Sequence, residues 1–288
     1  STCGARLFAV LDEPSLVDTN TGLPRLQVTQ GAVRFENVDF QYPLNKSGEN
    51  IISDISFEVG SGRTLGIVGP PGSGKSTIAR LIPRFYEPTA GRILVDGQDI
   101  AQVSITSLRQ AIGGVQQDPF LFTASVDHNV AYADPSTNLD QIVQASTDAQ
   151  IHSFIEELPR SYQTLVGEDG VSLSGGQRQR VSIARGTLTD APIFIFDDAT
   201  AAIDAGTEQR IRRALKARAG THTTIIISHR LVSLMHADEI LFLDEGCIVE
   251  RGTHEQLLAL KGRYFELHSL QLRDEHWSPR LTERIKPA

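Results

Sequence analysis

A short glycine-rich segment carries the strongest chemical signal in this sequence. Residues 69–76 read GPPGSGKS, which fits the phosphate-binding pattern G-x-x-x-x-G-K-[ST]. Gly72 and Gly74 let the backbone approach a phosphate group and adopt a positive φ. Lys75 supplies a positive charge for the β- and γ-phosphates, and Ser76 offers its hydroxyl group to Mg²⁺. The segment therefore predicts a site for the phosphates of a nucleotide.

The amides that bind these phosphates must come from the second half of the loop. Pro70 and Pro71 have no N–H group, so about residues 72–77 must supply the donors. The alternative is an accidental glycine-rich turn. A strand-like run at Leu65–Val68 and a helix-like stretch at Thr77–Phe85 favour the phosphate site, because the order is then strand, loop, helix. We expect the nucleotide-binding residues of this loop to be Gly69, Gly72, Ser73, Gly74, Lys75, Ser76 and Thr77.

Two adjacent carboxylates follow a second apolar run. Residues 193–198 read IFIFDD. A nucleotide site of this kind needs a carboxylate near its metal ion, and Asp197 is the expected one. Asp198 is then placed next to the γ-phosphate. The other interpretation is an acidic turn that merely ends a strand.

A second motif narrows the class of protein. The phosphate loop alone fits kinases, GTPases, motor proteins and many ATPases. Residues 173–180 read LSGGQRQR, which resembles the signature of ATP-binding-cassette (ABC) ATPases. From about residue 4 to about residue 272, the chain resembles the nucleotide-binding domain of an ABC exporter of the multidrug or lipid-exporter kind. This resemblance implies ATP hydrolysis as the activity, with ATP and Mg²⁺ as cofactors.

The resemblance also assigns roles to residues outside the phosphate loop. Tyr42 matches the aromatic residue that stacks on adenine, and Gln117 matches the glutamine that senses the metal and the γ-phosphate. His229 matches the switch histidine that contacts the γ-phosphate. Thr164–Gly170 resembles the segment that contacts the membrane domain in exporters, and Ala201–Asp204 resembles the loop that crosses the dimer interface.

Each of these single residues also has a simpler interpretation. Tyr42 could be a tyrosine at the edge of the core, Gln117 a solvated loop residue, and His229 a residue that only holds the end of a strand. The spacing of the others favours the functional interpretation in each case. In Ser174-Gly175-Gly176, the serine can cap a helix while the glycines let amides face an anion.

The family arrangement implies a dimer. In ABC exporters the signature lies opposite the phosphate loop of a second copy, so two ATP molecules are bound between two domains, identical or homologous. The resemblance thus assigns contact with the partner's ATP to Leu173, Ser174, Gly175, Gly176 and Gln177, the interface loop to Asp204, metal binding to Ser76, Gln117 and Asp197, and catalysis to Asp198, His229 and Gln117.

Asp198 departs from the family pattern, which has a glutamate at this position. An aspartate carboxylate falls roughly 1–1.5 Å short, a misplacement that can cost about 100-fold in rate. Ala201 stands where the family usually has serine. We expect nucleotide binding to be kept and hydrolysis at this chain's own site to be slow. An intact signature beside a shortened acid favours a different, homologous partner subunit, whereas the retained His229 favours the rival, a slow homodimer.

Strands must place these residues at one edge. Leu65–Val68, Ile193–Phe196 and Thr224–Ile227 are short continuous apolar runs, which predict buried parallel strands. The segments 32–42 and 51–59 alternate apolar and polar residues and, with Arg92–Val95, predict a small antiparallel sheet.

Helices are predicted between the strands. Residues 137–160 have helical spacing of apolar residues, and 204–219 form a second helix with Asp204 as its cap and Gly220 as its stop. Thr253 and Gln256 form a capping-box pattern ahead of a further helix.

These elements predict an α/β fold of the P-loop NTPase ABC-cassette type, with a mixed β-sheet core, an antiparallel β subdomain and a helical signature subdomain. We expect residues 1–30 to be a linker from a transmembrane domain and 31–270 to be the nucleotide-binding domain. Within it, about 118–176 form the helical subdomain. Residues 271–288 are expected to be a flexible tail.

Composition limits the remaining classes. The chain has 288 residues, 40% of them hydrophobic, which is enough for a sizeable core and excludes a disordered, collagen-like or disulfide-stapled chain. A net charge of −8 argues against a nucleic-acid partner. The two cysteines, Cys3 and Cys247, lie far apart in the sequence and do not have the spacing of a metal-binding pair. So few cysteines fit a protein of a reducing compartment.

The whole protein is expected to extend beyond this chain. No stretch of the sequence approaches the roughly 20 apolar residues of a membrane span. Residues 4–18 resemble the linker that leaves the last membrane helix of an ABC exporter. The resemblance therefore implies a membrane domain fused upstream and a location at the cytoplasmic face of the cell membrane. One alternative is a non-transport ABC ATPase. Another is a small-molecule kinase, which would leave LSGGQ, Gln117 and His229 unexplained.

Overall fold

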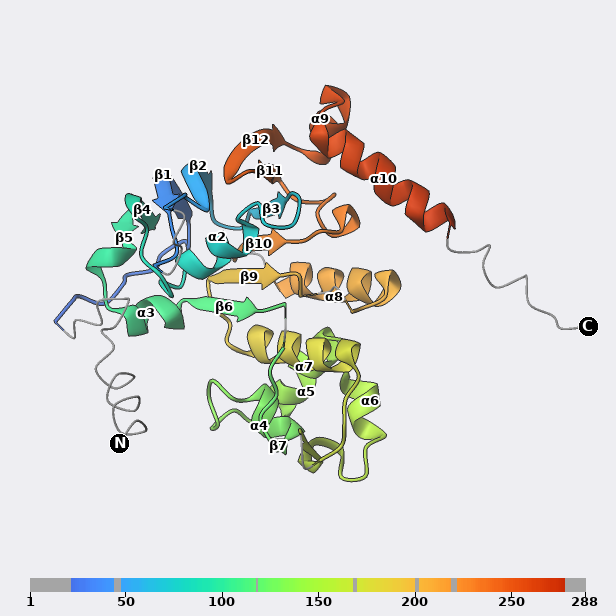
Figure 1. Cartoon of the computed structure of the whole chain (residues 1–288). Coiled ribbons are helices and arrows are strands. Elements are labelled where there is room, and N and C mark those ends of the chain that lie inside the picture. Colours follow the sequence, from blue (N-terminus) through green and yellow to red (C-terminus); the bar gives the residue numbers. More distant parts are fainter. Residues whose placement is uncertain are drawn as a thin grey trace, which may run out of the picture.

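A six-stranded sheet runs through the centre of the molecule (Figure 1). The structure is a computed structural model that describes residues 22–43, 48–117, 119–167, 170–199, 202–218 and 222–277. The strand order in this sheet is β12 (Cys247–Gly252), β11 (Glu239–Asp244), β3 (Thr64–Val68), β10 (Thr223–Ile227), β9 (Ile193–Asp197) and β6 (Ile112–Val115). All neighbours are parallel except β11 and β12.

The three predicted parallel strands are direct neighbours in this sheet. Ile225 of β10 is aligned with Leu65 of β3 on one side and with Ile195 of β9 on the other, and all three residues are buried. Because parallel strands end at the same edge, the segments that follow β3, β9 and β10 meet there. This edge brings together the predicted phosphate loop, the acidic pair and His229, the predicted switch histidine.

A second, antiparallel sheet covers the side of the phosphate-loop helix. Its order is β2 (Ile52–Val59), β1 (Val33–Phe40), β4 (Ala90–Val95) and β5 (Gln98–Asp99). The first three of these strands are the predicted small antiparallel sheet, and the short strand β5 adds to it. Phe35 and Phe57 stack with ring centroids 4.5 Å apart. Side chains of this sheet share one buried core with Ile78 and Leu81 of α2 (Lys75–Leu81).

A helical lobe lies below the central sheet in Figure 1. It holds α4 (Val126–Val130), α5 (Leu139–Asp148), α6 (His152–Glu156) and α7 (Gly175–Leu188), with the strand pair β7 (Ala124–Ser125) and β8 (Leu165–Val166). The buried core of this lobe also takes in Val115 of β6 and Ile211 of α8 (Ala205–Arg218), which attach the lobe to the sheet. The helix predicted over 137–160 is two helices, because the backbone turns at Gln150, which has a φ of 57°.

The remaining helices flank the sheet. They are α3 (Ile105–Gln110), α8 (Ala205–Arg218), α9 (His254–Leu260) and α10 (Arg263–Trp277), with single 3₁₀ turns η1 (Ile100–Gln102), η2 (Ser161–Gln163) and η3 (Leu231–Ser233). The predicted capping box of Thr253 and Gln256 starts α9. The predicted tail boundary at residue 270 falls inside α10, since the docked helix continues to Trp277. Residues 1–21 of the predicted linker, the predicted helix stop Gly220 and residues 278–288 of the predicted tail lie outside the described residues.

Candidate nucleotide site

The phosphate loop has the backbone conformation that its glycines allow. Gly69, Gly72 and Gly74 have φ values of 155°, 82° and 98°. A Cβ atom at Gly69 would collide with the carbonyl oxygen of Leu243, and one at Gly74 with the side chain of Ile52. Only glycine fits at both points, so the sheet and the neighbouring strands fix the shape of the loop.

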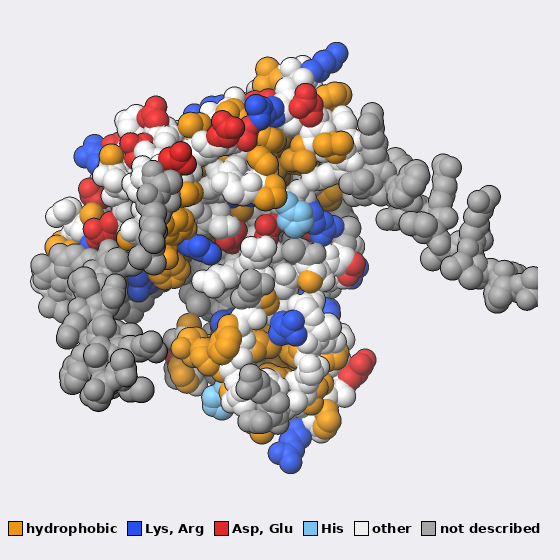
Figure 2. All heavy atoms as spheres, viewed as in Figure 1, with side chains coloured by type: hydrophobic (Ala, Val, Ile, Leu, Met, Phe, Trp, Pro, Cys, Tyr) orange, Lys and Arg blue, Asp and Glu red, His pale blue; other side chains and the backbone are white. Residues whose placement is uncertain are grey.

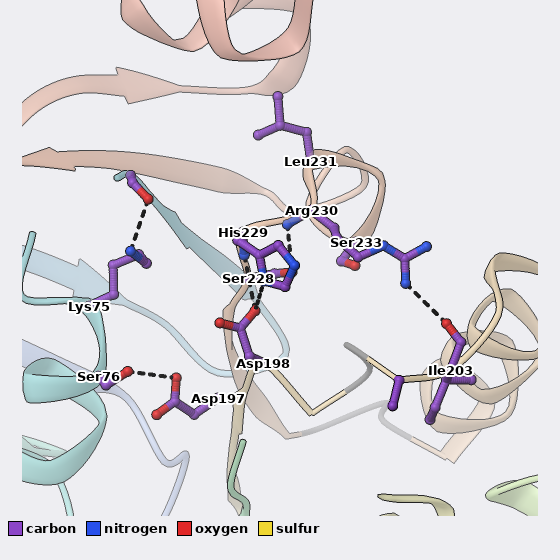
Figure 3. Close-up of polar contacts among 12 residues, drawn as sticks. Lys75, Ser76, Asp197, Asp198, Ile203, Ser228, His229, Arg230, Leu231 and Ser233 are labelled. Carbon is purple, nitrogen blue, oxygen red and sulfur yellow. Dashed lines mark hydrogen bonds and ion pairs between the residues drawn. The ribbon is translucent and has the colours of Figure 1, made fainter. Parts of the chain in front are cut away.

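Lys75 begins α2 and extends back over the loop (Figure 3). Its Nζ atom donates to the carbonyl oxygens of Gly69, at 2.9 Å, and Pro70, at 2.8 Å. Burial lowers the pKa of Lys75, while the charges of Asp198 and Asp197 act in the opposite direction. The ammonium group is thus half-buried next to two carbonyl oxygens. A charged donor in this position can form strong hydrogen bonds to a phosphate group.

Ser76 and Asp197 form the candidate metal site. The Ser76 hydroxyl donates to Asp197 Oδ1 at 3.1 Å (Figure 3). Burial raises the pKa of Asp197, and the hydrogen bond from Ser76 partly offsets this rise. A hydroxyl and a carboxylate oxygen side by side suit Mg²⁺, which takes oxygen ligands and keeps few protein contacts beside substrate phosphates.

Asp198 and His229 face each other across the sheet edge. Asp198 Oδ1 accepts from the backbone N–H of His229 at 3.0 Å and lies 2.8 Å from its Nδ1 atom (Figure 3). The backbone of Asp198 has a φ of 45°, and its N–H donates to the carbonyl oxygen of Ile227 at 2.8 Å. The imidazole is 58% exposed, whereas the carboxylate is only 12% exposed. An acid–imidazole pair therefore stands at the mouth of the site.

The predicted adenine contact lies beside the phosphate loop. Tyr42 follows β1 and is half-buried, with its ring edge-to-face with those of Phe40 and Tyr86. Its hydroxyl lies 3.3 Å from Thr77 Oγ1, and Arg80 donates to it at 3.3 Å. Hydrogen bonds from its hydroxyl group therefore hold the Tyr42 ring next to α2.

The signature residues start α7 in the helical lobe. Ser174 and Gln177 form a capping box, in which Ser174 Oγ accepts from the Gln177 N–H and Gln177 Oε1 accepts from the Ser174 N–H. Leu173 is buried. A Cβ atom at Gly176 would lie 2.7 Å from the Ala202 carbonyl oxygen, so the start of α7 packs tightly on the segment before Asp204.

The structure therefore brings the predicted residues into two groups within one chain. The phosphate loop, Asp197, Asp198, His229 and Tyr42 lie around the sheet edge. The signature belongs to the other lobe, which lies below the sheet (Figure 1) and in which α7 packs in a different buried cluster from that of α2. Gln117 is exposed just after β6, which leads from the sheet to that lobe.

Asp204 caps α8 as predicted. Its carboxylate accepts from the Thr207 N–H at 2.9 Å, and this hydrogen bond lowers the pKa of Asp204. The side chain is exposed and stands at the start of the helix, next to the segment that contacts the signature.

Sequence reasoning missed the side chains that hold the switch-histidine loop. Arg230 donates to the Ile203 carbonyl oxygen at 3.1 Å and pairs with the buried carboxylate of Glu208 at 3.1 Å. Gln271 of α10 bonds to the backbone of the same loop. Their spacing gives no motif, because α8, the loop and α10 are far apart in the chain. The only signal in the sequence is Arg230, directly after His229, since a basic residue there could have suggested an acidic partner on another element.

Comparison with known proteins decides the family. The sequence pattern described as "ABC transporter" matches residues 52–201, from β2 to the residues after the acidic pair. The chain belongs to the ABC transporter family. ATP-binding domains of this family are ATPases, and the fold here is the ABC cassette with a mixed core sheet, an antiparallel subdomain and a helical signature subdomain.

Several ABC relatives are similar over nearly the whole chain. An uncharacterized ABC transporter ATP-binding protein, YknU of Bacillus subtilis, is 43% identical over 272 residues, which are 94% of this chain and 46% of that protein. The ATP-dependent lipid A-core flippase of Chromohalobacter salexigens is 42% identical over 268 residues, 93% of this chain and 46% of the flippase.

A solved structure shows the same fold. The structure of a bacterial Atm1-family ABC exporter with ATP bound superposes with a TM-score of 0.87 at 45% identity, over 93% of this chain and 46% of that chain. The chain thus spans about half the length of the ABC relatives that it matches. Among the described residues, no helix is long and apolar enough to cross a membrane.

Proposed function

We propose that this chain is the ATP-driven domain of an ABC exporter, at the cytoplasmic face of the membrane, and that it works by ATP-dependent head-to-tail dimerisation. The observation that carries the proposal is the division of the nucleotide site. One chain holds a phosphate loop in one lobe and a signature helix in the other. A site that needs both is completed by a second ABC domain.

The chemistry of each half supports this arrangement. In the first half, the loop amides and Lys75 bind the phosphates. Ser76, Asp197 and Gln117 would hold Mg²⁺, which would supply positive charge next to the phosphates. In the second half, Ser174 Oγ accepts a hydrogen bond from the Gln177 N–H, which leaves the hydroxyl proton to donate to the partner's γ-phosphate. ATP thus satisfies donors on both domains and stabilises the pair.

Hydrolysis requires a water molecule placed in line with the γ-phosphate. Asp198 accepts from His229, so the two act as one unit that orients the attacking water and takes up its proton. The short aspartate side chain places its carboxylate roughly 1–1.5 Å back from a glutamate's position. We propose that this site hydrolyses ATP slowly and that the native partner is a different, homologous subunit, with a slow homodimer as the rival.

The helical lobe offers a surface for a membrane-domain partner. β7 pairs with β8, which joins the segment after Gln117 to the segment that resembles the membrane-contacting one. Exposed apolar side chains lie beside this pair, with Phe120 67%, Tyr132 57% and Leu165 56% exposed. Figure 2 shows hydrophobic side chains gathered on this lobe around α4 and β7. We propose that a transmembrane domain docks here.

A complementation experiment on the full-length protein tests the head-to-tail proposal. Lys75→Ala breaks only the phosphate loop, and Ser174→Arg breaks only the signature. Each variant alone is expected to lose ATPase activity. In a mixed dimer, the phosphate loop of one variant meets the signature of the other, so one site of two is intact.

An equal mixture is then expected to recover about a quarter of the wild-type sites, because about half of the dimers are mixed. No recovery in proteins shown by cross-linking to form mixed dimers would refute a site shared between two copies of this chain. Gln141→Leu, on the exposed face of α5, is the control for handling and should behave as wild type.

A further inference from the structure

The loop that carries the switch histidine is bonded to a side chain from the far C-terminal helix. Gln271 of α10 donates from Nε2 to the carbonyl oxygen of His229 at 2.5 Å, and its Oε1 accepts from the N–H of Leu231 at 3.0 Å. These groups belong to the two peptide bonds on either side of Arg230. Only one orientation of the amide satisfies both, because the carbonyl needs a donor and the N–H needs an acceptor.

These bonds leave the backbone of the histidine little freedom. The N–H of His229 donates to the Asp198 carboxylate at 3.0 Å, and its carbonyl oxygen accepts from Gln271 at 2.5 Å. Both backbone polar groups of the histidine are therefore fixed by side chains from other elements. The imidazole, which is 58% exposed, must take its direction from this fixed backbone.

The helix that supplies Gln271 is itself firmly placed. Tyr264, near the start of α10, is completely buried, and its hydroxyl lies 2.7 Å from His254 Nδ1. Glu250 of β12 accepts from the backbone N–H groups of Arg263, at 2.6 Å, and Tyr264, at 3.1 Å. Gln271 follows Tyr264 by two helical turns, so both lie on the face that packs toward the sheet.

We propose that Gln271 is a positioning residue for His229, and that α10 thereby sets the rate of ATP hydrolysis without taking part in nucleotide binding. Gln271 bonds to the loop backbone and not to the phosphate loop. Its effect must therefore pass through the placement of the imidazole. This inference rests on the proposed role of His229 at the γ-phosphate, and the experiment below separates the two.

The test uses the full-length protein with Gln271→Met, which keeps the length and helix propensity of the side chain but removes both hydrogen bonds. We expect kcat to fall about 10-fold, since small misplacements of catalytic groups have effects of this order or larger. The KM for ATP and the affinity for a labelled nucleotide should stay within twofold of wild type. Gln271→Glu keeps the acceptor for Leu231 but places a carboxylate oxygen, a second acceptor, against the His229 carbonyl oxygen, so it should lower kcat at least as much as Gln271→Met.

Gln141→Met is the matched control, since Gln141 is an exposed glutamine on α5; it should leave kcat and KM unchanged. The thermal unfolding midpoint of every variant is recorded. A fall in kcat at an unchanged midpoint and an unchanged KM supports positioning. A wild-type kcat in Gln271→Met, or a kcat that falls only together with nucleotide affinity, would overturn the inference.

A double-mutant cycle ties the effect to the histidine. In a His229→Ala background, Gln271→Met should have no further effect on single-turnover hydrolysis, because the group that it positions is already gone. Equal losses from Gln271→Met in both backgrounds would count against the inference. If His229→Ala alone hydrolyses ATP at the wild-type rate, the proposed function of the histidine fails, whatever Gln271 does.

Discussion

Lys75 is the residue on which nucleotide binding should depend most. Its Nζ atom bonds to two carbonyl oxygens of its own loop, so these contacts stabilise the loop only locally. Lys75→Ala removes the charge that neutralises the β- and γ-phosphates, and we expect Mg-ATP to bind at least about 100-fold more weakly, since charge-assisted phosphate contacts are among the strong ones. Titration with a labelled nucleotide checks this, with the unfolding midpoint recorded for the fold. Unchanged affinity would remove the phosphate-loop assignment.

Asp198 should limit the rate of hydrolysis. Its carboxylate reaches His229 at 2.8 Å, but it is one methylene shorter than a glutamate. Asp198→Glu moves the carboxylate forward by about 1–1.5 Å, and we expect the ATPase rate of this chain to rise about 10-fold or more. Asp198→Asn is the control and should lower the rate, because it removes the proton acceptor. A flat or lower rate in Asp198→Glu would mean that the aspartate already serves the reaction.

Much of the site follows from local sequence, and the rest does not. Gly69, Gly74, Lys75 and Ser76 could be predicted because the loop chemistry is contained in a few consecutive residues. The acidic pair could be placed because a buried strand leads into it. Gln271 could not be predicted, since its contacts join residues 40 and 42 positions apart in the chain and depend on how α10 lies against the sheet.

At the scale of elements, the sequence predicts strands that are continuous apolar runs but does not predict strands that lack this pattern. β3, β9 and β10 are continuous apolar runs, and they pair as neighbours. β6 reads IGGV, and its two glycines give it little strand propensity. It forms because β9 offers an open edge with Ile195 aligned to Gly114. The pattern at 137–160 could not show the break, because a turn at Gln150 leaves the spacing of apolar residues intact.

The ion pair of Arg230 with Glu208 should hold α8 to the switch-histidine loop. Glu208 is 1% exposed and Arg230 26%, and Glu208 also accepts from Ser233. Arg230→Met leaves a buried carboxylate without its cation, so we expect the free energy of unfolding to fall by about 3–5 kcal/mol. Replacing both residues by methionine should recover most of this loss. Urea denaturation measures both effects.

A matched surface pair provides the control for this prediction. Arg34 pairs with Glu58 at 2.9 Å, and both side chains are about half exposed. Arg34→Met should cost only about 0–1 kcal/mol, as solvent-exposed ion pairs do. If Arg34→Met and Arg230→Met lowered the free energy of unfolding by similar amounts, the burial of Glu208 would not explain the contribution of its ion pair to stability.

Asp96, which follows β4 of the antiparallel sheet, should make the free energy of unfolding depend on pH. Burial acts to raise the pKa of Asp96, but the backbone N–H groups of Gln30, Thr29, Gly31 and Ala32 donate to its carboxylate, and the net effect lowers this pKa. Because the folded-state pKa lies below the unfolded value of about 3.9, the stabilisation is present above that value and is lost as the pH falls through the folded-state pKa.

Asp96→Asn should remove this dependence. Urea denaturation between pH 7 and pH 2 is expected to show a gap between wild type and variant that is constant near neutral pH and narrows below about pH 4. A gap of the same size at pH 7 and pH 2 would contradict an ionised Asp96 as the anchor of residues 29–32.

At the scale of the whole molecule, the proposed dimer gives each chain two halves of different sites. The helix after the phosphate loop and the signature helix α7 pack in different buried clusters. We therefore expect this chain alone to be monomeric in solution without nucleotide and to dimerise weakly with Mg-ATP, because the proposed membrane domains would be needed to raise the local concentration of the two copies. Sedimentation velocity with and without Mg-ATP measures this. A tight dimer without nucleotide would contradict it.

The composition of that dimer separates the two partner models. Ser174→Arg leaves the phosphate loop intact, so it should bind ATP as wild type does while losing the ATP-dependent dimer. This outcome in a solution of this chain alone would show self-pairing through the signature, as a homodimer requires.

The native complex gives the second test. If the shortened Asp198 instead means that the partner's site carries out most of the hydrolysis, the native membrane complex should contain a second, homologous ABC subunit in equal amount. That subunit's phosphate loop should then face the intact signature of this chain. Affinity purification of the tagged full-length protein, with mass determination of the complex, decides between them. A complex that contains only this chain would exclude the heterodimer, and the slow rate expected from Asp198 would then apply to both of its sites.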